Sequence, residues 1–358
     1  MTVLNTAPFQ RDRYIYATCF MVIVLHFVAH QILGTPFLSS FYILFTFKAF
    51  AMTCLLGFVV YFFVLLYRRE KSPLSQYAKF ISYPFKHPSE ALNIALMLTA
   101  ISLILSVYTS VKDAISFINP FYLDPLLISL EEKIHFGYQP WQLTHALFNS
   151  SLATGVINLF YNLWFFFCWI FIIYFCVATR NAQLRQQALI SFIGCWMLIG
   201  GVLAILFSSV GPCFYGNAYD QSPLFDPLMT LLNAQHNELL EQDMYIAVWA
   251  LKTQDLLWSS HIANASTFGE GISAMPSMHV SMATLMALSL SALNKKLGVL
   301  GWLYLVMIQI GSVHLGWHYA LDGYVSIPLT IAIWYAVKKL VPSPNAIREK
   351  QPRMRPYA

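Results

Sequence analysis

Charged residues are scarce in this chain of 358 residues, where Asp, Glu, Lys and Arg make up 10% of the sequence and hydrophobic residues 58%. Soluble globular domains carry about 25% charged residues. The mean hydropathy of +0.59 also lies outside the range of that class. The shortage of charge therefore excludes a soluble domain and predicts a polytopic membrane protein.

Cysteines are few, and internal repeats are absent. The chain has six cysteines, and all but Cys213 lie in apolar runs, so the sequence offers neither a disulfide framework nor a CxxC metal motif. No internal repeat or low-complexity segment is present. We expect no metal and no other cofactor.

Long apolar runs are what the sequence has in abundance. A transmembrane helix needs roughly 20 mainly apolar residues. Windows of that length predict an all-α fold with about eight transmembrane helices, at residues 14–34, 41–67, 91–111, 155–178, 187–209, 276–293, 297–314 and 323–340. The first run follows Arg11 and Arg13 and has no A-x-A-like exit, which favours a retained anchor over a cleaved signal peptide.

Lysine and arginine are distributed unevenly between the segments that join these spans. With the N-terminus in the cytoplasm, the outer segments hold only Lys112, Lys133 and Lys252. The inner segments hold Arg11, Arg13, Arg68, Arg69, Lys71, Lys79, Lys86, Arg180, Arg185, Lys295, Lys296, Lys338, Lys339, Arg348, Lys350, Arg353 and Arg355. This asymmetry predicts that both termini are cytoplasmic. It also assigns the net charge of +5 to membrane orientation, not to nucleic-acid binding.

Three parts are expected along the chain. Residues 1–90 form an N-terminal helix pair with a basic cytoplasmic loop. Residues 91–340 form a six-helix core with two outer-face segments, 112–153 and 210–275. Residues 341–358 are a basic cytoplasmic tail that is placed to touch anionic lipid. We expect the protein in a membrane, and specifically in a bacterial inner membrane.

Some polar residues have two interpretations. His26 and His30 lie four apart on the first span, which suits metal ligands, but without neighbouring Cys, Asp or Glu we favour packed or interfacial histidines. In the first outer segment the apolar period around Glu131 predicts a short amphipathic helix on the outer leaflet, acting either as a covering lid or as a substrate gate. The fourth span has no titratable side chain of the Asp, Glu, His, Lys or Arg type, so we assign it to packing. Most carboxylates of the second outer segment are expected to be solvated.

The stretch from residue 269 to residue 323 stands apart from the apolar sequence around it. Pro276 is expected to begin a helix, since proline suits the first helical position, with Ser277, Met278 and His279 in the first turn. The unpaired backbone N–H groups of such a turn bind anions.

A second histidine lies on the same predicted outer face. His318 precedes Asp322 by four residues, so a helix places both on one side, where the carboxylate fixes the imidazole tautomer. His314 lies one turn earlier. Ionisable groups that cluster at this depth are costly and are functional by default. Together the segments predict a two-histidine site for phosphoryl transfer at the outer face.

These residues resemble signatures of the type 2 phosphatidic acid phosphatase superfamily, namely its second, Pro276-Ser277-Met278-His279, and its third, His318-Tyr319-Ala320-Leu321-Asp322. The chain looks most like the branch with inositol phosphorylceramide synthases of the aureobasidin-resistance type and sphingomyelin synthases. The likeness covers roughly residues 90 to 340, in the order of the family's six-helix core. It implies a lipid phosphotransferase or phosphatase in which His318 forms a phosphohistidine, Asp322 orients it, and His279 protonates the leaving group.

The chain departs from this family at the phosphate-binding cations. Ala204 stands in place of the first signature's lysine, only Pro212 remains of its Arg-Pro pair, and Ser312 replaces the third signature's arginine. We expect Ser277, His314, Tyr215 and the helix N-terminus to share that work, although His314 suits a packing role equally well.

The expected partners are membrane lipids, a lipid phosphate or phosphodiester donor and a polyol or other alcohol acceptor. No nucleic acid is expected. Two alternatives stay open: an ordinary lipid phosphate phosphatase, or a non-catalytic lipid-binding or transport protein of the same fold.

Overall fold

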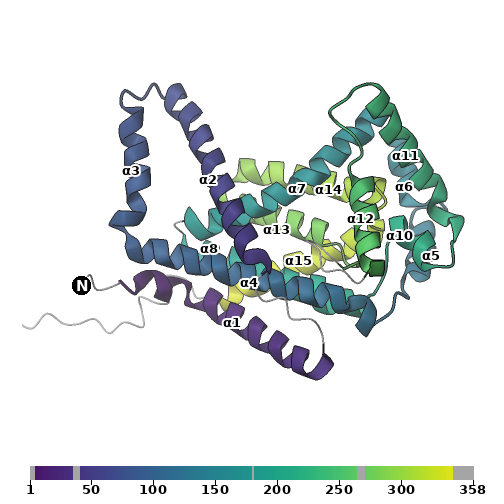
Figure 1. Ribbon diagram of the computed structural model, residues 1–358, viewed down its shortest axis with the longest axis horizontal. Helices are drawn as coiled ribbons and strands as arrows, with labels where there is room; N and C mark the ends of the chain where they lie inside the picture. Colours follow the sequence, from purple (N-terminus) through teal and green to yellow (C-terminus); the bar gives the residue numbers. More distant parts are fainter. Residues whose placement is uncertain (1–4, 35–40, 180, 264–270, 342–358) are drawn as a thin grey trace, which may run out of the picture.

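A computed structural model of the chain describes residues 5–34, 41–179, 181–263 and 271–341. Within these ranges every regular element is a helix, so the predicted all-α class is confirmed. Figure 1 shows most of the long helices running along the horizontal axis of the view, with shorter helices collected at its right end. Nearly all of the predicted tail lies outside the described residues.

Seven helices in the described residues are long and apolar enough to cross a membrane. They are α1 (Ala7–Leu33), α2 (Phe41–Tyr67), α4 (Pro88–Ile118), α7 (Ser151–Val177), the continuous run of α8 (Ala182–Gly194), η1 (Cys195–Leu203) and α9 (Ala204–Leu206), then α14 (Lys295–His314) and α15 (Ala320–Leu340). The eighth predicted span is α13 (Met278–Leu293), whose 16 residues fall short of a full crossing. At 1.5 Å per residue α13 is about 24 Å long, against roughly 30 Å of hydrocarbon.

Helix α13 begins two residues later than the sequence predicted. Ser277 is its N-cap, and the Ser277 Oγ accepts a hydrogen bond from the Val280 N–H at 3.4 Å. Pro276 therefore precedes the helix and does not occupy its first turn. Serine wins the capping position because its hydroxyl satisfies an amide that has no acceptor inside the helix.

Six short helices gather at the right end of the molecule in Figure 1, and we call them the outer helices because the sequence predicts them on the outer face. They are α5 (Asp124–Ile134), α6 (Pro140–Leu147), α10 (Pro212–Ala218), η2 (Pro223–Phe225), α11 (Asp226–Glu241) and α12 (Ala250–Ala263). The predicted amphipathic helix is present as α5. In such a helix Glu131 would face water, but it does not. Its side chain is buried against the protein, while Leu126 and Leu130 on the same helix are exposed.

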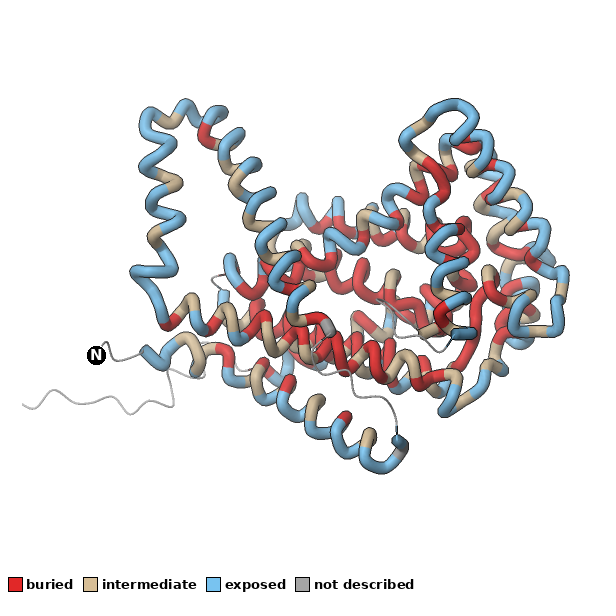
Figure 2. Tube along the Cα trace, viewed as in Figure 1, coloured by how far each residue is buried: buried red, intermediate tan, exposed pale blue. Residues whose placement is uncertain are grey.

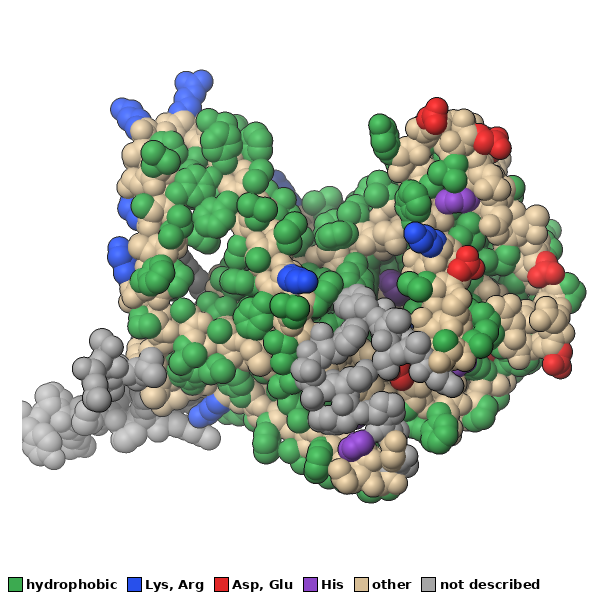
Figure 3. Space-filling view, in the orientation of Figure 1, with side chains coloured by type: hydrophobic (Ala, Val, Ile, Leu, Met, Phe, Trp, Pro, Cys, Tyr) green, Lys and Arg blue, Asp and Glu red, His purple; other side chains and the backbone are tan. Residues whose placement is uncertain are grey.

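The basic segment between α2 and α4 forms helix α3 (Pro73–Lys86), where the sequence indicated only a domain boundary. Pro73 occupies its first turn, which suits a residue without an N–H. None of the residues of α3 is buried. Figure 1 shows α3 at the left end, roughly perpendicular to the long helices, and Figure 3 shows Lys and Arg side chains around it.

The core lies among α4, α7, α8, α13, α14 and α15, where Figure 2 shows most of the buried residues. The α13–α14 hairpin is its tightest pair. A Cβ added at Gly301 of α14 would lie 2.8 Å from the Ala287 Cα. Glycine at this position lets the two backbones approach, and α13 is thereby held between α14, α15 and α8.

A buried ion pair joins α1 to α8 at the end of the bundle away from the outer helices. Arg185 was expected in a cytoplasmic loop, but its side chain is 1% exposed and lies 3.0 Å from Asp12, which is fully buried. Asn93 of α4 donates to the same carboxylate at 2.7 Å. Shielding from water makes this network costly to break, because removing one partner leaves an uncompensated charge inside the protein.

Candidate active site

A cavity of about 370 Å³ opens between the membrane helices and the outer segments. Polar groups, including both predicted catalytic histidines, belong to its lining near the N-terminus of α13. The remaining wall is mostly aromatic and aliphatic. Its lining includes Tyr42, Leu105, Tyr108, Lys112, Tyr161, Trp164, Phe165, Trp169, Phe192, Trp196, Gly200, Ala204, Gly271, Ser273, Pro276, Met278, His279, Trp317 and His318. An apolar cavity with a few convergent polar groups is the usual form of a small-molecule site.

His318 contacts two acceptors through one ring nitrogen. Its Nδ1 is 3.2 Å from the Asp322 Oδ2 and 2.9 Å from the Ala274 carbonyl oxygen. Because both partners only accept, a neutral imidazole carries its proton on Nδ1. Nε2 then keeps its lone pair, which is the state that a nucleophile requires.

Asp322 is held by the start of the helix that carries it. Its side chain is fully buried, and Oδ2 also accepts from the Tyr319 N–H at 3.0 Å. Tyr319 is the N-cap of α15, so the carboxylate stabilises the helix start and orients His318 at once. The two side chains are in contact as predicted, although His318 precedes helix α15 and does not share a helix face with Asp322.

The Ala274 carbonyl is positioned by a chain of backbone contacts. The Ala274 N–H donates to the Ser209 carbonyl at 3.0 Å, and the Met275 N–H donates to the Ser209 Oγ at 3.0 Å. Nearby, Gly211 adopts φ +88°, and a Cβ there would lie 2.8 Å from the Trp317 carbonyl oxygen. Glycine is required at this close approach, which brings the residues around 209–211 and 274–275 beside His318.

His279 lies across the cavity from His318, with 5.9 Å between the ring centroids. Its ring stacks on Tyr161 at 4.7 Å and lies 4.3 Å from Trp164. The Trp164 Nε1–H also donates to the His279 carbonyl at 3.0 Å. Both aromatic residues belong to α7, the span that the sequence assigned to packing alone, so α7 forms a wall of the site and fixes the plane of His279.

The other predicted phosphate ligands lie in different surroundings. Ser277 is fully buried and its hydroxyl caps α13, next to the free amides of that helix's first turn. His314 contacts Thr154 and Thr144 through its two ring nitrogens, at 2.9 and 3.3 Å, and stacks on His145 at 3.7 Å. Tyr215 stacks on Tyr219 at 4.6 Å. None of these three residues is among those that line the described cavity, so their contacts with phosphate stay predictions.

Asp124 of α5 is a buried carboxylate that sequence reasoning missed. It accepts hydrogen bonds from the N–H groups of Val210 and Gly211 at 3.0 and 2.9 Å. It also accepts from the hydroxyls of Tyr219 and Tyr319, each at 3.0 Å. Through these bonds α5 joins the segment around Gly211 to the start of α15. The only signal in the sequence was an Asp-Pro pair at the start of a helix.

Glu131 lies about two turns further along α5 than Asp124, and it also contacts the start of α15. Its Oε1 accepts from the Leu321 N–H at 3.1 Å, and only 2% of the residue is exposed. Burial raises the pKa of Glu131 from 4.5 to about 8. The hydrogen bond from Leu321 lowers this pKa, and the negative charge of Asp322 raises it by a smaller amount. The folded protein therefore binds a proton at neutral pH that the unfolded chain does not bind.

We expect this carboxyl group to make folding stability depend on pH. Between pH 4.5 and 8 the folded state holds the extra proton, so stability is highest below this window and falls as pH rises through it. Glu131→Gln keeps a neutral side chain of similar shape and should flatten the decline. Melting temperatures at pH 5.5 and 8.5 should show the variant gaining on the wild type by a few degrees, at roughly 1–2 °C per kcal/mol for a chain of this length.

The matched control is Glu241→Gln, because Glu241 is exposed at the end of α11. It should leave the slope unchanged. Equal slopes for the wild type and Glu131→Gln would show that Glu131 is ionised in the folded protein at neutral pH.

Metal-ligand geometry does not occur in the part of the chain that the structure describes, where no group of three His, Cys, Asp or Glu side chains is arranged to hold an ion. His26 and His30 accordingly have no third ligand of these types among the described residues.

Comparison with known proteins supplies one match. A family model described as the PAP2 superfamily matches residues 125–336, from α5 to α15, which is more than half of the chain. The matched region begins later than the resemblance at residues 90 to 340 suggested. No curated protein and no solved structure matches the chain.

Proposed function

The chain belongs to the PAP2 superfamily, and from this membership we propose that it is an integral-membrane enzyme that transfers a lipid phosphoryl group through a phosphohistidine on His318. The observation that carries the proposal is the pairing of His318 Nδ1 with Asp322 and the Ala274 carbonyl, which leaves Nε2 available inside the cavity. His279 is close enough to contact the same bound phosphoryl group.

The proposed reaction has two steps. Nε2 of His318 attacks phosphorus, the bond from phosphorus to the leaving oxygen breaks, and His279 gives that oxygen a proton. A hydroxyl group then attacks the phosphohistidine, His279 takes its proton, and the phosphorus–nitrogen bond breaks. Water as the attacking group gives hydrolysis, whereas an alcohol gives transfer. Asp322 stabilises the positive charge that develops on His318 in the first step.

The wall of the cavity supports a lipid substrate. Leu105, Phe165, Trp169 and Phe192 extend the lining away from the histidines and into the membrane helices. Such a surface accepts hydrocarbon, since burying apolar area from water is favourable by roughly 25 cal/mol per Å². The phosphate of such a lipid would lie at the first turn of α13, where the amides of Met278 and His279 have no acceptor within the helix.

The charge of the site favours a phosphodiester donor. Ala204 and Ser312, which stand where similar phosphatases carry cations, are 2% and 1% exposed, and the Ser312 hydroxyl donates to the Gln309 carbonyl. A phosphomonoester dianion needs more positive charge than a diester monoanion. We therefore propose transfer from a diester lipid to an alcohol, as in the branch of inositol phosphorylceramide-type synthases.

The distribution of charge supports a site that faces outward. On the face shown in Figure 3, lysine and arginine gather toward the left end and acidic side chains over the helices at the right. The left end carries the basic segment predicted to be cytoplasmic, and the cavity's histidines lie toward the outer helices. Under the positive-inside rule this distribution supports the proposal that both termini lie in the cytoplasm.

We expect competition in one vessel to separate transfer from hydrolysis. Purified protein is given phosphatidic acid and a phosphodiester lipid together, with and without a polyol, and both products are measured. The diester should be consumed faster, and the polyol should appear in a new phosphodiester that keeps the ester group of the donor that did not leave in the first step. A chelator should not change either rate, because the proposed route needs no metal.

Two results would contradict this proposal. Faster release of inorganic phosphate from phosphatidic acid, unaffected by the polyol, would identify an ordinary lipid phosphatase. Lipid binding without turnover of either donor would identify a non-catalytic member of the family.

A further inference from the structure

Lys112 of α4 lines the cavity together with both histidines of the site. We propose that Lys112 binds the transferred phosphoryl group and takes the place of the cations that this chain lacks at Ala204 and Ser312. The inference rests on the proposed function, because it assigns a phosphate ligand to that same site. Lys112 precedes the region that matches the family, so it is a feature of this chain outside the matched sequence.

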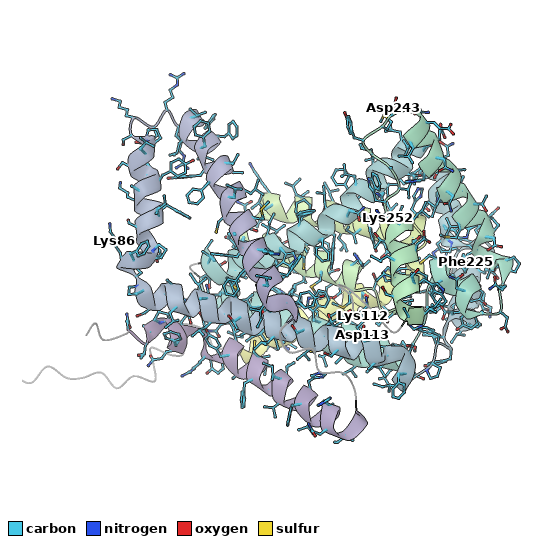
Figure 4. All side chains as sticks on the ribbon, in the orientation of Figure 1. Lys86, Lys112, Asp113, Phe225, Asp243 and Lys252 are labelled. Carbon is cyan, nitrogen blue, oxygen red and sulfur yellow. The ribbon has the colours of Figure 1, made fainter. Side chains whose placement is uncertain are left out.

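The three lysines predicted on the outer face differ in their surroundings. Lys133 and Lys252 are exposed and do not line the cavity, whereas Lys112 is partly buried and does. Figure 4 labels Lys112 on the outer half of α4 and Lys252 on α12. Among the described lining residues, Lys112 is the one lysine or arginine. Any phosphate in this cavity therefore has Lys112 as its nearest source of permanent positive charge within the lining.

Small residues stand on the helix that packs against α4. Helix α4 packs against η1 and α9, the segments that carry Gly200 and Ala204. Both residues line the same cavity as Lys112. Because Ala204 carries a methyl group where the family's first signature has a lysine, this helix supplies no cation at that position, and the lysine in the lining comes from α4 instead.

The segment that leads into α13 runs directly over Lys112. Gly271 adopts φ +82°, and a Cβ added there would lie 2.7 Å from the Lys112 carbonyl carbon. Only a glycine tolerates both that conformation and that contact. This contact holds the α4 backbone at Lys112 against the segment that carries Ser273 and Pro276, which line the same cavity. Lys112, the residues that lead into α13 and the two histidines thus line one cavity.

The surroundings make a single cation effective. Aromatic and aliphatic groups form most of the wall, so the local dielectric is low and a charge–charge attraction is stronger than in water. Phosphoryl transfer depends on positive groups placed around the equatorial oxygens. One lysine matches the single negative charge of a phosphodiester, which agrees with the proposed donor class.

The test compares Lys112→Met with Lys112→Arg, and uses Lys252→Met as the matched control. For each protein, turnover of a phosphodiester lipid is measured in detergent micelles. Binding of orthovanadate is measured separately, from the rise in melting temperature that it causes. Lys112→Met should lower kcat/KM by about 10²–10³-fold, the range for loss of one group that stabilises a transition-state oxyanion. The vanadate concentration needed for half-maximal protection should rise at least tenfold. Lys112→Arg should recover most of both, and Lys252→Met should match the wild type.

The two readouts separate the inference from the proposed function. Lys112→Met with wild-type kcat/KM and vanadate protection would overturn the role of Lys112 while leaving the enzyme in place. Vanadate protection lost in Lys112→Met, in a wild type that turns over no lipid, would support the anion site and remove the proposed function. Loss of both readouts in Lys112→Met and in Lys112→Arg would show that the position is structural, and would also overturn the inference.

Discussion

Replacing His318 with alanine is expected to abolish turnover, with a loss of roughly 10⁴–10⁶-fold, as when a covalent nucleophile is removed. The reason is that in the proposed mechanism His318 Nε2 is the atom that bonds phosphorus. Radiolabelled donor lipid should leave an acid-labile, alkali-stable label on the wild-type protein, which is the stability expected of phosphohistidine. The variant should carry no such label.

A suitable control is His261→Ala, because His261 lies on α12 beside the rings of Phe121 and Trp258, outside the cavity lining. It should retain both label and turnover. If His318→Ala still formed an acid-labile phosphoprotein, the nucleophile would have to be another residue, and His279 would be the next to test.

Replacing His279 with alanine should give a loss that depends on the leaving group. Protonation by a positioned side chain contributes about 10²–10⁴-fold when the leaving oxygen is a poor one, as in an alcohol. A nitrophenyl leaving group departs without a proton, so its release should be nearly unimpaired. The second step still needs His279 as a base, and the phosphoenzyme should therefore accumulate after a burst of nitrophenol.

Asp322→Asn provides the contrast, since it alters the orientation of His318 and should slow both substrates alike. Burst kinetics with nitrophenyl and alkyl donors measure the difference. An equal loss for both leaving groups in His279→Ala would indicate that His279 positions the phosphate and does not donate a proton.

Much of this architecture could be predicted from local sequence. Apolar runs located the membrane helices to within several residues, because hydrocarbon thickness imposes a length that composition alone reveals. The contact between His318 and Asp322 was expected from helical spacing, but His318 precedes helix α15, and Asp322 contacts it while accepting the Tyr319 N–H at the helix start. The start of α13 was placed wrongly because proline at a helix start was weighed above the serine that follows it, whose hydroxyl caps the helix.

The hydrogen bonds that join the outer segments to the start of α15 could not be predicted in this way. Asp124 looked like any carboxylate at a helix start, and its bond to Tyr319 spans 195 positions of sequence. Glu131 has the same character, since its partner on α15 is 190 positions away. Lys112 left a weak signal, as one of three lysines assigned to the outer face of a site short of cations. Only the fold showed which of the three lines the cavity.

The ion pair between Asp12 and Arg185 bears on how the protein is made. Close to it, the Gln186 side chain bonds the Arg11 carbonyl across 175 positions of sequence. At 5–20 residues per second the ribosome needs roughly 10–35 s to cover that distance, so α1 is inserted long before α8 exists. During that interval Asp12 lacks the charge of Arg185, and the contacts of α1 with α8 form only when α8 arrives. A chain shortened to the matched region would have no Asp12, and the buried guanidinium of Arg185 would lack its counter-charge in the assembled bundle.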